Sequence, residues 1–112
     1  MVAFNFKPEF TDKILSGVKR STIRTTKRCK VGDIMQLYTG QRTKKCRKLK
    51  DAICTGVHPV TIDEHQRLHV DIEDAGYLWQ REGFDSPDDF IDFFEDHYGL
   101  PFTGYLHKWS AA

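Results

Sequence analysis

The segment at residues 16–24, SGVKRSTIR, places three cations around two hydroxyl groups. The cations are Lys19, Arg20 and Arg24, and the hydroxyls belong to Ser21 and Thr22. Cationic groups beside hydroxyls bind phosphate oxygens, and a hydroxyl beside a basic group is also a potential nucleophile. The segment therefore indicates a binding or catalytic role. The alternative is that the segment only connects a helix to a strand and has no functional role.

The charge of the chain is divided between its halves, although it sums to +1 over 112 residues. Residues 1–50 hold fourteen Lys and Arg against three Asp and Glu, whereas residues 51–112 hold three against thirteen. Such asymmetry favours a basic surface that binds a polyanion. The alternative is that the two halves face each other and neutralise within the fold.

The densest basic run is QRTKKCRKLK, residues 41–50. Exposed cations of this kind contact nucleic-acid phosphates, and such binding weakens steeply with salt. The residues expected to make these contacts are Arg42, Lys44, Lys45, Arg47 and Lys48. A solvated loop is the competing interpretation. Tyr38 and Trp79 are candidates for stacking on a base, although such aromatic residues are more often part of the core.

The composition is that of a folded globular domain, and 112 residues correspond to a single domain spanning 1–112. No apolar run reaches the ~18 residues of a membrane span, and the N-terminus lacks a signal-peptide layout. We therefore expect a cytoplasmic location and no membrane partner. The spacing of Cys29, Cys46 and Cys54 lacks the close pair of a structural zinc site. We expect neither a metal nor a cofactor.

Local patterns predict an α+β domain built on short, mostly antiparallel strands. Strands are expected at 2–6, 34–40, 51–62, 67–72 and 102–109, with an extended segment at 21–25, a bulge at Gly56 and an exposed loop or hairpin tip at 41–50. Helices are expected at 7–17, 74–84 and 86–99. The last carries a full set of boundary signals, with Ser86 as cap, Pro87 in the first position and Gly99 at the end. Its Phe90, Phe93 and Phe94 are expected in the core.

The whole chain resembles the ASCH domain of the PUA-like superfamily. The resemblance rests on the segments FTDKILSGVKRSTIR, KVGDIMQLY, YLWQREGFDSPDDFIDFF and FTGYLHKW. Its most specific part is the pattern G-x-K-x-x-T-x-R formed by Gly17, Lys19, Thr22 and Arg24. It implies a PUA-like small β-barrel of mostly antiparallel strands with about three helices packed around it. It also implies a protein that binds RNA or a modified nucleoside.

One branch of that family consists of small amidohydrolases that remove acyl groups from the exocyclic amine of cytidine. That branch relies on a Lys, a Thr and a Glu. Lys19 and Thr22 match within the motif, and Glu82 matches by its place in the helix after the strands. The resemblance therefore implies that Lys19, Thr22 and Glu82 are catalytic. We expect the substrate to be bound by Arg20, Ser21, Arg24, Tyr38 and Trp79.

Amide hydrolysis needs a nucleophile, a base and a stabiliser for the oxyanion. Thr22 supplies a hydroxyl, and Lys19 acts as a base only when its amine is neutral. Lowering the pKa of a lysine from about 10.4 to about 7.5 takes ~4 kcal/mol, and the neighbouring Arg20 and Arg24 together with partial burial could supply such a shift. A nearby Glu82 opposes the shift, and it could instead orient the cytosine ring or carry the proton to the leaving amine.

Two other functions are open at the level of the sequence. A non-catalytic RNA-binding module would bind strands through the basic run without turnover. A metal-dependent ribonuclease would lose strand cleavage with a chelator, and it ranks last because the basic half contains no acidic metal cluster.

Overall fold

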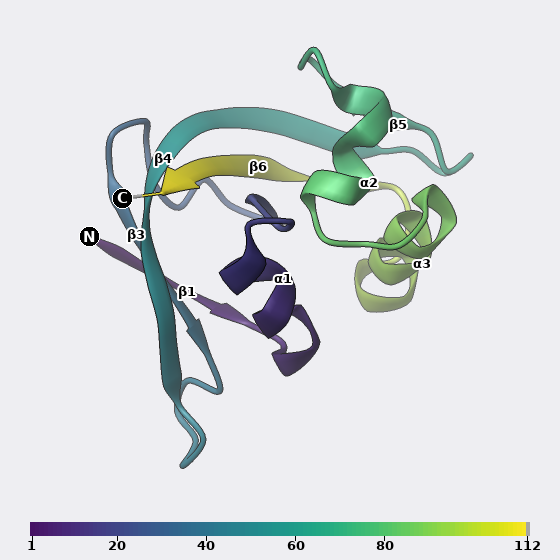
Figure 1. Cartoon of the computed structure of the whole chain (residues 1–112). Helices are drawn as coiled ribbons and strands as arrows, with labels where there is room; N and C mark the ends of the chain where they lie inside the picture. The colour runs from purple at the N-terminus through teal and green to yellow at the C-terminus, as the bar shows by residue number, and fades with distance from the viewer. Residues whose placement is uncertain (112) are drawn as a thin grey trace.

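The strands form one mixed sheet in the computed structural model, which describes residues 1–111. The strand order is β1-β3-β4-β6-β2, and β5 pairs with β4. Only β1 and β3 are parallel, and the other pairs are antiparallel. The bounds are β1 Val2–Phe6, β2 Ser21–Arg24, β3 Ile34–Thr39, β4 Arg47–Ile62, β5 Leu68–Val70 and β6 Phe102–Ala111. The sheet curls into a half-barrel with the helices on its concave side (Figure 1).

The long strand β4 bends the sheet because it carries a bulge. Its register against β6 shifts between Cys54 and Gly56, which confirms the bulge predicted at Gly56. The run 41–50 was expected to be an exposed loop or hairpin tip, and it does contain the tip of the β3–β4 hairpin. The strand expected at 51–62 begins earlier, however, since β4 starts at Arg47 and pairs there with Thr39. The physical reason is Leu49, which is half-buried and packs against the core, so the strand extends into the basic run.

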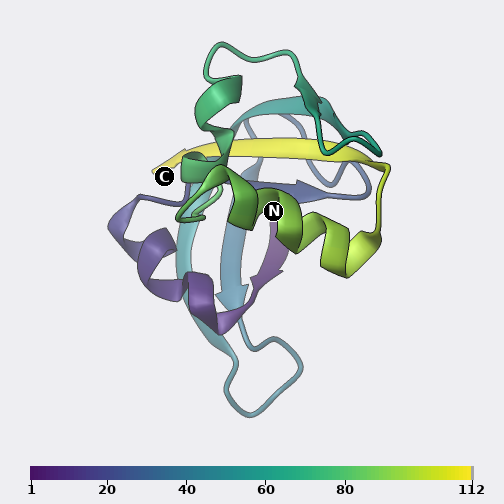
Figure 2. The ribbon, with the colours of Figure 1, turned by 90° about the vertical axis from the view of Figure 1, so that its right-hand side faces the viewer.

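The basic run therefore forms the tip and one arm of a β3–β4 hairpin. This hairpin projects from one end of the molecule in both ribbon views (Figure 2). The backbone N–H of Gln41 donates to Asn5 Oδ1 at 2.9 Å, which ties the base of the hairpin to β1.

Two of the three predicted helices are shorter than expected. The first divides into a 3-10 turn, η1 (Pro8–Phe10), and α1 (Thr11–Ser16), which ends at Gly17 in a left-handed conformation with φ 84°. The second divides into η2 (Ala75–Tyr77) and α2 (Leu78–Arg81), so Glu82 lies at the end of the helix as its C-cap. Neither sequence holds a long apolar stripe, and helices this short depend on tertiary packing.

The third helix, α3 (Pro87–Tyr98), follows its boundary signals closely. The Ser86 hydroxyl accepts a hydrogen bond from the Asp89 backbone N–H at 3.1 Å, and the helix ends before Gly99. Phe90 and Phe94 are buried as predicted, whereas Phe93 is only half-buried.

The buried side chains form two clusters that meet beside α3. The first joins Phe4, Phe6, Phe10 and Ile14 to the β3 and β4 side chains, and the second joins Ile23 and Leu106 to Phe90 and Phe94. Phe84 and Phe93 pack against both clusters. The junction leaves a cavity between aromatic walls, and the candidate site lies there. No helix within residues 1–111 is long and apolar enough to cross a membrane.

Candidate active site

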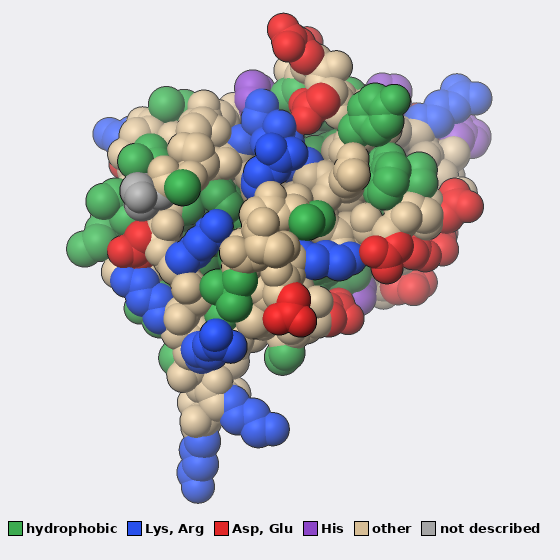
Figure 3. All heavy atoms as spheres, in the orientation of Figure 1, with side chains coloured by type: hydrophobic (Ala, Val, Ile, Leu, Met, Phe, Trp, Pro, Cys, Tyr) green, Lys and Arg blue, Asp and Glu red, His purple; other side chains and the backbone are tan. Residues whose placement is uncertain are grey.

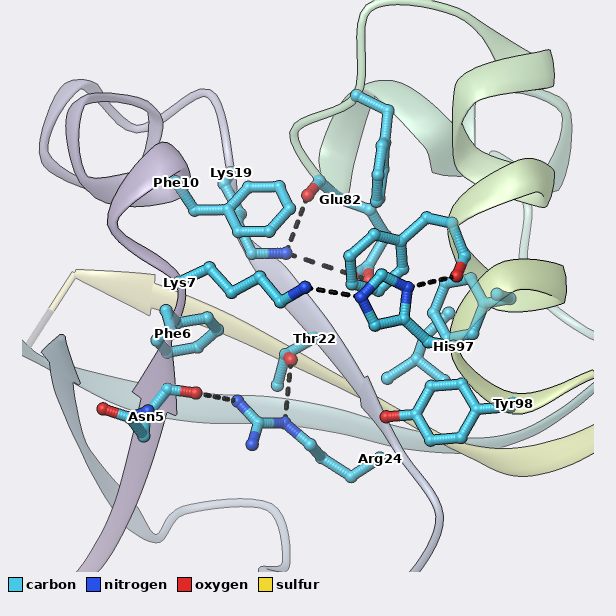
Figure 4. Close-up of a pocket in the computed structure, with 14 residues that line it drawn as sticks. Asn5, Phe6, Lys7, Phe10, Lys19, Thr22, Arg24, Glu82, His97 and Tyr98 are labelled. Atoms are coloured by element: carbon cyan, nitrogen blue, oxygen red, sulfur yellow. Dashed lines mark hydrogen bonds and ion pairs between the residues drawn. The ribbon is translucent and has the colours of Figure 1, made fainter. Parts of the chain in front are cut away.

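A cavity of about 170 Å³ opens between β1, β2, η1 and α3. Its lining combines aromatic walls with a small set of charged and polar groups (Figure 4). The polar members are Asn5, Lys7, Lys19, Thr22, Arg24, Glu82, His97 and Tyr98. An apolar pocket with a few convergent polar groups is the usual form of a small-molecule site.

Lys19 is held in the cavity wall by backbone bonds on both sides. The left-handed Gly17 ends α1 and turns the chain, so that the Lys19 N–H reaches the Lys13 carbonyl at 2.9 Å. The next residue, Arg20, bonds through its backbone to Arg81 and Trp109. These contacts aim the Lys19 side chain inward, where the residue is 3% exposed.

The Lys19 ammonium has two oxygen neighbours on Glu82 and an aromatic face beneath it. Nζ donates to the Glu82 carbonyl at 2.7 Å and lies 3.8 Å from Oε1 of the same residue. It also lies 4.8 Å from the centroid of the Phe10 ring. The carboxylate and the amine come from segments 63 residues apart, so the pair exists only in the folded chain.

Burial lowers the pKa of Lys19 to about 8, because an ammonium loses its hydration inside the protein. The Glu82 carboxylate opposes this shift, while the charges of Arg24 and Lys13 add to it. From the sequence, Arg20, Arg24 and partial burial were all expected to lower this pKa. The structure assigns the largest effect to burial and replaces Arg20 by Lys13.

Glu82 is held from the side opposite the cavity by Ser21. The residue is 2% exposed, and its Oε2 accepts a short hydrogen bond from the fully buried Ser21 hydroxyl. Oε1 is then left on the side of Lys19. Ser21 does not line the cavity, so the structure places it behind the carboxylate and not against a substrate.

Gly83, which follows Glu82 at the end of α2, allows the backbone there to approach Lys19 closely. Its φ of +91° is left-handed, and a Cβ there would lie 3.2 Å from Lys19 Cβ. Its carbonyl also accepts from Lys13 Nζ at 2.5 Å. The α2 end is thereby clamped against α1, with Glu82 facing the cavity.

Thr22 lies on the cavity floor with Arg24 beside it (Figure 4). Thr22 is 5% exposed, and its Oγ1 accepts from Arg24 Nε at 3.1 Å. Arg24 Nη2 donates to the Asn5 carbonyl at 2.9 Å, and its guanidinium lies over Phe6 at 5.0 Å. Within residues 1–111 the structure shows no hydrogen bond between Thr22 and Lys19.

The side of the cavity nearest α3 carries residues that sequence reasoning missed. His97 Nδ1 lies 2.8 Å from the Phe93 carbonyl, and its Nε2 lies 2.5 Å from Lys7 Nζ. The His97 ring stacks on Phe93 at 4.1 Å between centroids. The available signal was the four-residue spacing of Phe93 and His97, which places both on one helix face. Lys7 and Asn5 had no comparable signal.

Several predicted substrate-binding residues lie elsewhere. Arg20 is exposed and contributes backbone bonds, while Tyr38 faces Lys48 across the β3–β4 pair and lines no part of the cavity. Trp79 is half-buried and packs against the second cluster. The physical reason is the short α2, which directs Trp79 away from the cavity that Glu82 faces.

The five predicted nucleic-acid contacts are exposed on the β3–β4 hairpin. They are Arg42, Lys44, Lys45, Arg47 and Lys48. Figure 3 shows basic side chains gathered on this projection. Lys48 also pairs with Asp51 at 2.8 Å. Among residues 1–111 there is no group of three or more His, Cys, Asp or Glu arranged to hold a metal ion.

The curled mixed sheet with its three helices defines a small α+β fold. The fold matches the crystal structure of an ASCH protein from Zymomonas mobilis with a TM-score of 0.62 and 14% identity. The match covers 97% of this chain and 66% of that chain. Two variants of the same protein, one with a tyrosine-to-phenylalanine and one with a serine-to-alanine substitution, match with the same TM-score at 17% and 16% identity.

The expected ASCH-like fold is therefore confirmed. The variants cover 96% and 97% of this chain, and 67% and 66% of their own. This chain thus spans about two-thirds of the length of the ASCH protein that it resembles. No protein-family model and no curated protein matches the sequence. At 14% to 17% identity the likeness concerns the fold.

Proposed function

We propose that the cavity binds an acylated cytosine and hydrolyses the acyl group from its exocyclic amine. The observation that carries the proposal is a buried lysine whose pKa falls to about 8, next to a buried carboxylate and a threonine in one cavity. Amines with a pKa near neutrality serve as general bases, and strongly shifted groups gather at functional sites. The resemblance to acylcytidine amidohydrolases supplies the substrate class.

In the first step the Thr22 hydroxyl attacks the carbonyl carbon of the amide. The new C–O bond forms as the hydroxyl proton passes to the neutral amine of Lys19. The carbonyl becomes an oxyanion, and Arg24 is the cationic donor nearest to Thr22 Oγ1. At pH 7.5 a pKa of about 8 leaves about a quarter of the lysines neutral, so this step proceeds at neutral pH.

In the second step the C–N bond to cytosine breaks, and Lys19 returns its proton to the leaving amine. Cytidine departs, and the acyl group stays on Thr22 as an ester. Water then attacks the ester carbonyl while Lys19 accepts a proton. The ester C–O bond breaks, the proton returns to Thr22, and the carboxylic acid leaves. Atoms and protons balance over the cycle with water as the only co-substrate.

Glu82 supports this cycle by holding Lys19 and favouring its protonated intermediate. Its Oε1 lies 3.8 Å from Nζ, so the carboxylate stabilises the ammonium that forms when Thr22 loses its proton. Its Oε2 is occupied by Ser21, which fixes the carboxylate in place. The shape of the cavity agrees with a small reacting group, because 170 Å³ is below the ~300 Å³ of a pocket that encloses a whole ligand.

The test is release of cytidine from N4-acetylcytidine, followed by liquid chromatography. We expect turnover by the wild-type protein and a fall of about a hundredfold or more in Thr22→Ala and in Lys19→Met. Thr26→Ala removes an exposed threonine of the same segment and should keep full activity. Circular dichroism verifies that each variant is folded. Absence of turnover in the wild type, or full activity in Thr22→Ala, would refute the proposal.

The exposed β3–β4 hairpin favours a second function, the binding of RNA. Its five predicted cations are exposed, so phosphate oxygens can reach them. We expect affinity for a single-stranded oligoribonucleotide to fall with salt, and the slope of log K against log salt to be smaller in Lys44→Ala/Lys45→Ala. An unchanged slope in that variant would exclude the hairpin as the contact.

A further inference from the structure

We propose that Arg24 and Arg28 form a phosphate-binding subsite at the seam between β1 and β2. The subsite would take a phosphate of the nucleotide whose acylated base enters the cavity. This inference rests on the proposed function and deepens it, because it makes the substrate a nucleotide or an RNA strand and not a free nucleoside.

The seam exists because the half-barrel does not close. β1 pairs only with β3 and β2 pairs only with β6, so the two strands are the free edges of the sheet. Two arginine side chains span the gap between them. Arg24 Nη2 donates to the Asn5 carbonyl at 2.9 Å, and Arg28 Nη2 donates to the Ala3 carbonyl at 3.0 Å. These carbonyls lie two residues apart along the edge of β1.

Both guanidinium groups lie over the same buried ring. Their central carbons are 5.3 Å and 5.0 Å from the centroid of Phe4, which is fully buried. The backbone N–H of Arg28 donates to His107 Nε2 at 3.0 Å, which anchors the segment after β2 to the core. The half-buried Arg24 and the exposed Arg28 are therefore brought together by the position of β2 and by this backbone anchor.

Among residues 1–111 no carboxylate is paired with either of the two charges, and Glu82 acts on Arg24 only through its more distant charge. Burial is the main cause that lowers the pKa of Arg24, the charge of Arg28 adds to it, and the charge of Glu82 opposes it. The nearest acid in the sequence, Asp33, accepts instead from the Lys30 backbone N–H at 3.0 Å. A bound anion would relieve the repulsion between the two guanidinium groups.

The guanidinium groups also keep donors for such an anion. An arginine has five N–H donors, and Arg24 uses its Nε and Nη2 groups whereas Arg28 uses Nη2. The remaining donors suit the bidentate binding of phosphate. The alternative is that the two arginines only hold the edges of β1 and β2 together through the carbonyl contacts. A carbonyl carries no net charge, however, so these contacts leave the two cations without a paired anion.

Arg24 connects this subsite to the cavity. Its Nε lies 3.1 Å from Thr22 Oγ1, while its other end reaches the seam at Asn5 (Figure 4). A base that enters the cavity therefore leaves its sugar and phosphate on the side of the seam. The cavity of about 170 Å³ agrees with this division, because a whole nucleotide does not fit inside it.

The experiment compares ligands with and without a phosphate. Equilibrium binding of cytidine and of cytidine 5′-monophosphate is measured by calorimetry, and turnover is measured with the N4-acetyl form of each. We expect the phosphate to improve affinity and kcat/KM about tenfold or more, equivalent to about 1.4 kcal/mol. Arg28→Ala should abolish that gain and leave cytidine unaffected. Lys30→Ala removes an exposed cation of the same segment and should retain the gain.

A short RNA that contains one acetylated cytidine distinguishes the two sources of phosphate. Arg28-dependent binding of the RNA would identify a phosphodiester, and the same dependence in the mononucleotide alone would identify a free nucleotide. Phosphate-dependent binding without turnover would retain the subsite and reject the hydrolase. Turnover that is equal for nucleoside and nucleotide, or a phosphate gain that survives in Arg28→Ala, would overturn the subsite.

Discussion

The low pKa of Lys19 has a measurable consequence for stability between pH 8 and 10.5. In the folded protein burial lowers the pKa from 10.5 to about 8, whereas the unfolded chain keeps the ordinary value. In that pH window the unfolded state holds a proton that the folded state has lost. The free energy of unfolding contributed by Lys19 therefore rises with pH. A shift of about 2.5 pH units at about 1.36 kcal/mol each amounts to ~3 kcal/mol.

The perturbation is Lys19→Met, which has no titrating amine at this position. The assay is urea unfolding followed by tryptophan fluorescence at steps from pH 7.5 to 10.5. From pH 7.5 to 10.5 the free energy of unfolding of the wild-type protein should rise by about 3 kcal/mol relative to that of the variant. Lys27→Met, which removes an exposed lysine near the same segment, controls for the loss of one positive charge.

The comparison of slopes matters more than absolute stability. Lys19→Met removes the hydrogen bond that Nζ donates to the Glu82 carbonyl in either protonation state, and this lowers the stability of the variant at every pH of the series. That loss cancels in the pH dependence. Parallel curves for the wild type and Lys19→Met would refute the reasoning, because they would mean that Lys19 does not release its proton near pH 8. The role of Lys19 as a base would then fall as well.

Three further predictions concern the same cluster. First, kcat/KM for N4-acetylcytidine should rise with pH and level off above about 8, because the base must be neutral; a flat profile would contradict it. Second, Ser21→Ala should cost about 1–3 kcal/mol in urea unfolding and lower kcat more than KM changes, since Glu82 Oε2 loses its donor. A loss of stability with unchanged kcat would mean that Ser21 only packs. Third, Gly83→Ala should destabilise by more than about 1 kcal/mol in the same assay, because φ is +91° and the new Cβ would press on Lys19; a stability equal to the wild type would contradict this.

Elements with strong local signals could be predicted from the sequence. The α3 helix begins with Ser86 and Pro87 and ends before Gly99, and each signal acts through neighbouring backbone groups. The left-handed Gly17 and the bulge beside Gly56 are also local features of the backbone. The order of the expected elements indicated an α+β domain, the resemblance to the ASCH domain implied the barrel-like sheet, and the likeness to the ASCH structure confirms this fold class.

The arrangement of the site depends on contacts that no local pattern contains. Glu82 was expected inside a helix, but the short α2 ends at Arg81 and turns the carboxylate toward Lys19. Ser21 was expected to bind substrate, yet its strand position directs the hydroxyl to Glu82. Both outcomes depend on how α1, α2 and β2 pack together. That packing cannot be predicted from local sequence patterns, since Lys19 and Ser21 lie about sixty residues from Glu82 in the chain.

Leu49 illustrates the same limit in the sheet. The surrounding lysines and arginines predicted an exposed loop or hairpin tip, but one half-buried leucine and the pairing with β3 were enough to extend β4 to Arg47. The β-propensity of a segment reflects burial and cross-strand neighbours more than the residues themselves.

The most direct test of the central claim is capture of the acyl group on Thr22. The wild-type protein is mixed with N4-acetylcytidine labelled in the acetyl group, quenched in acid within a turnover and digested. The account predicts label in the peptide that contains Thr22, and none in Thr22→Ala or Lys19→Met. Turnover of the labelled substrate by the wild type with no label on the chain, or label on a different residue, would contradict the assignment of Thr22 as nucleophile.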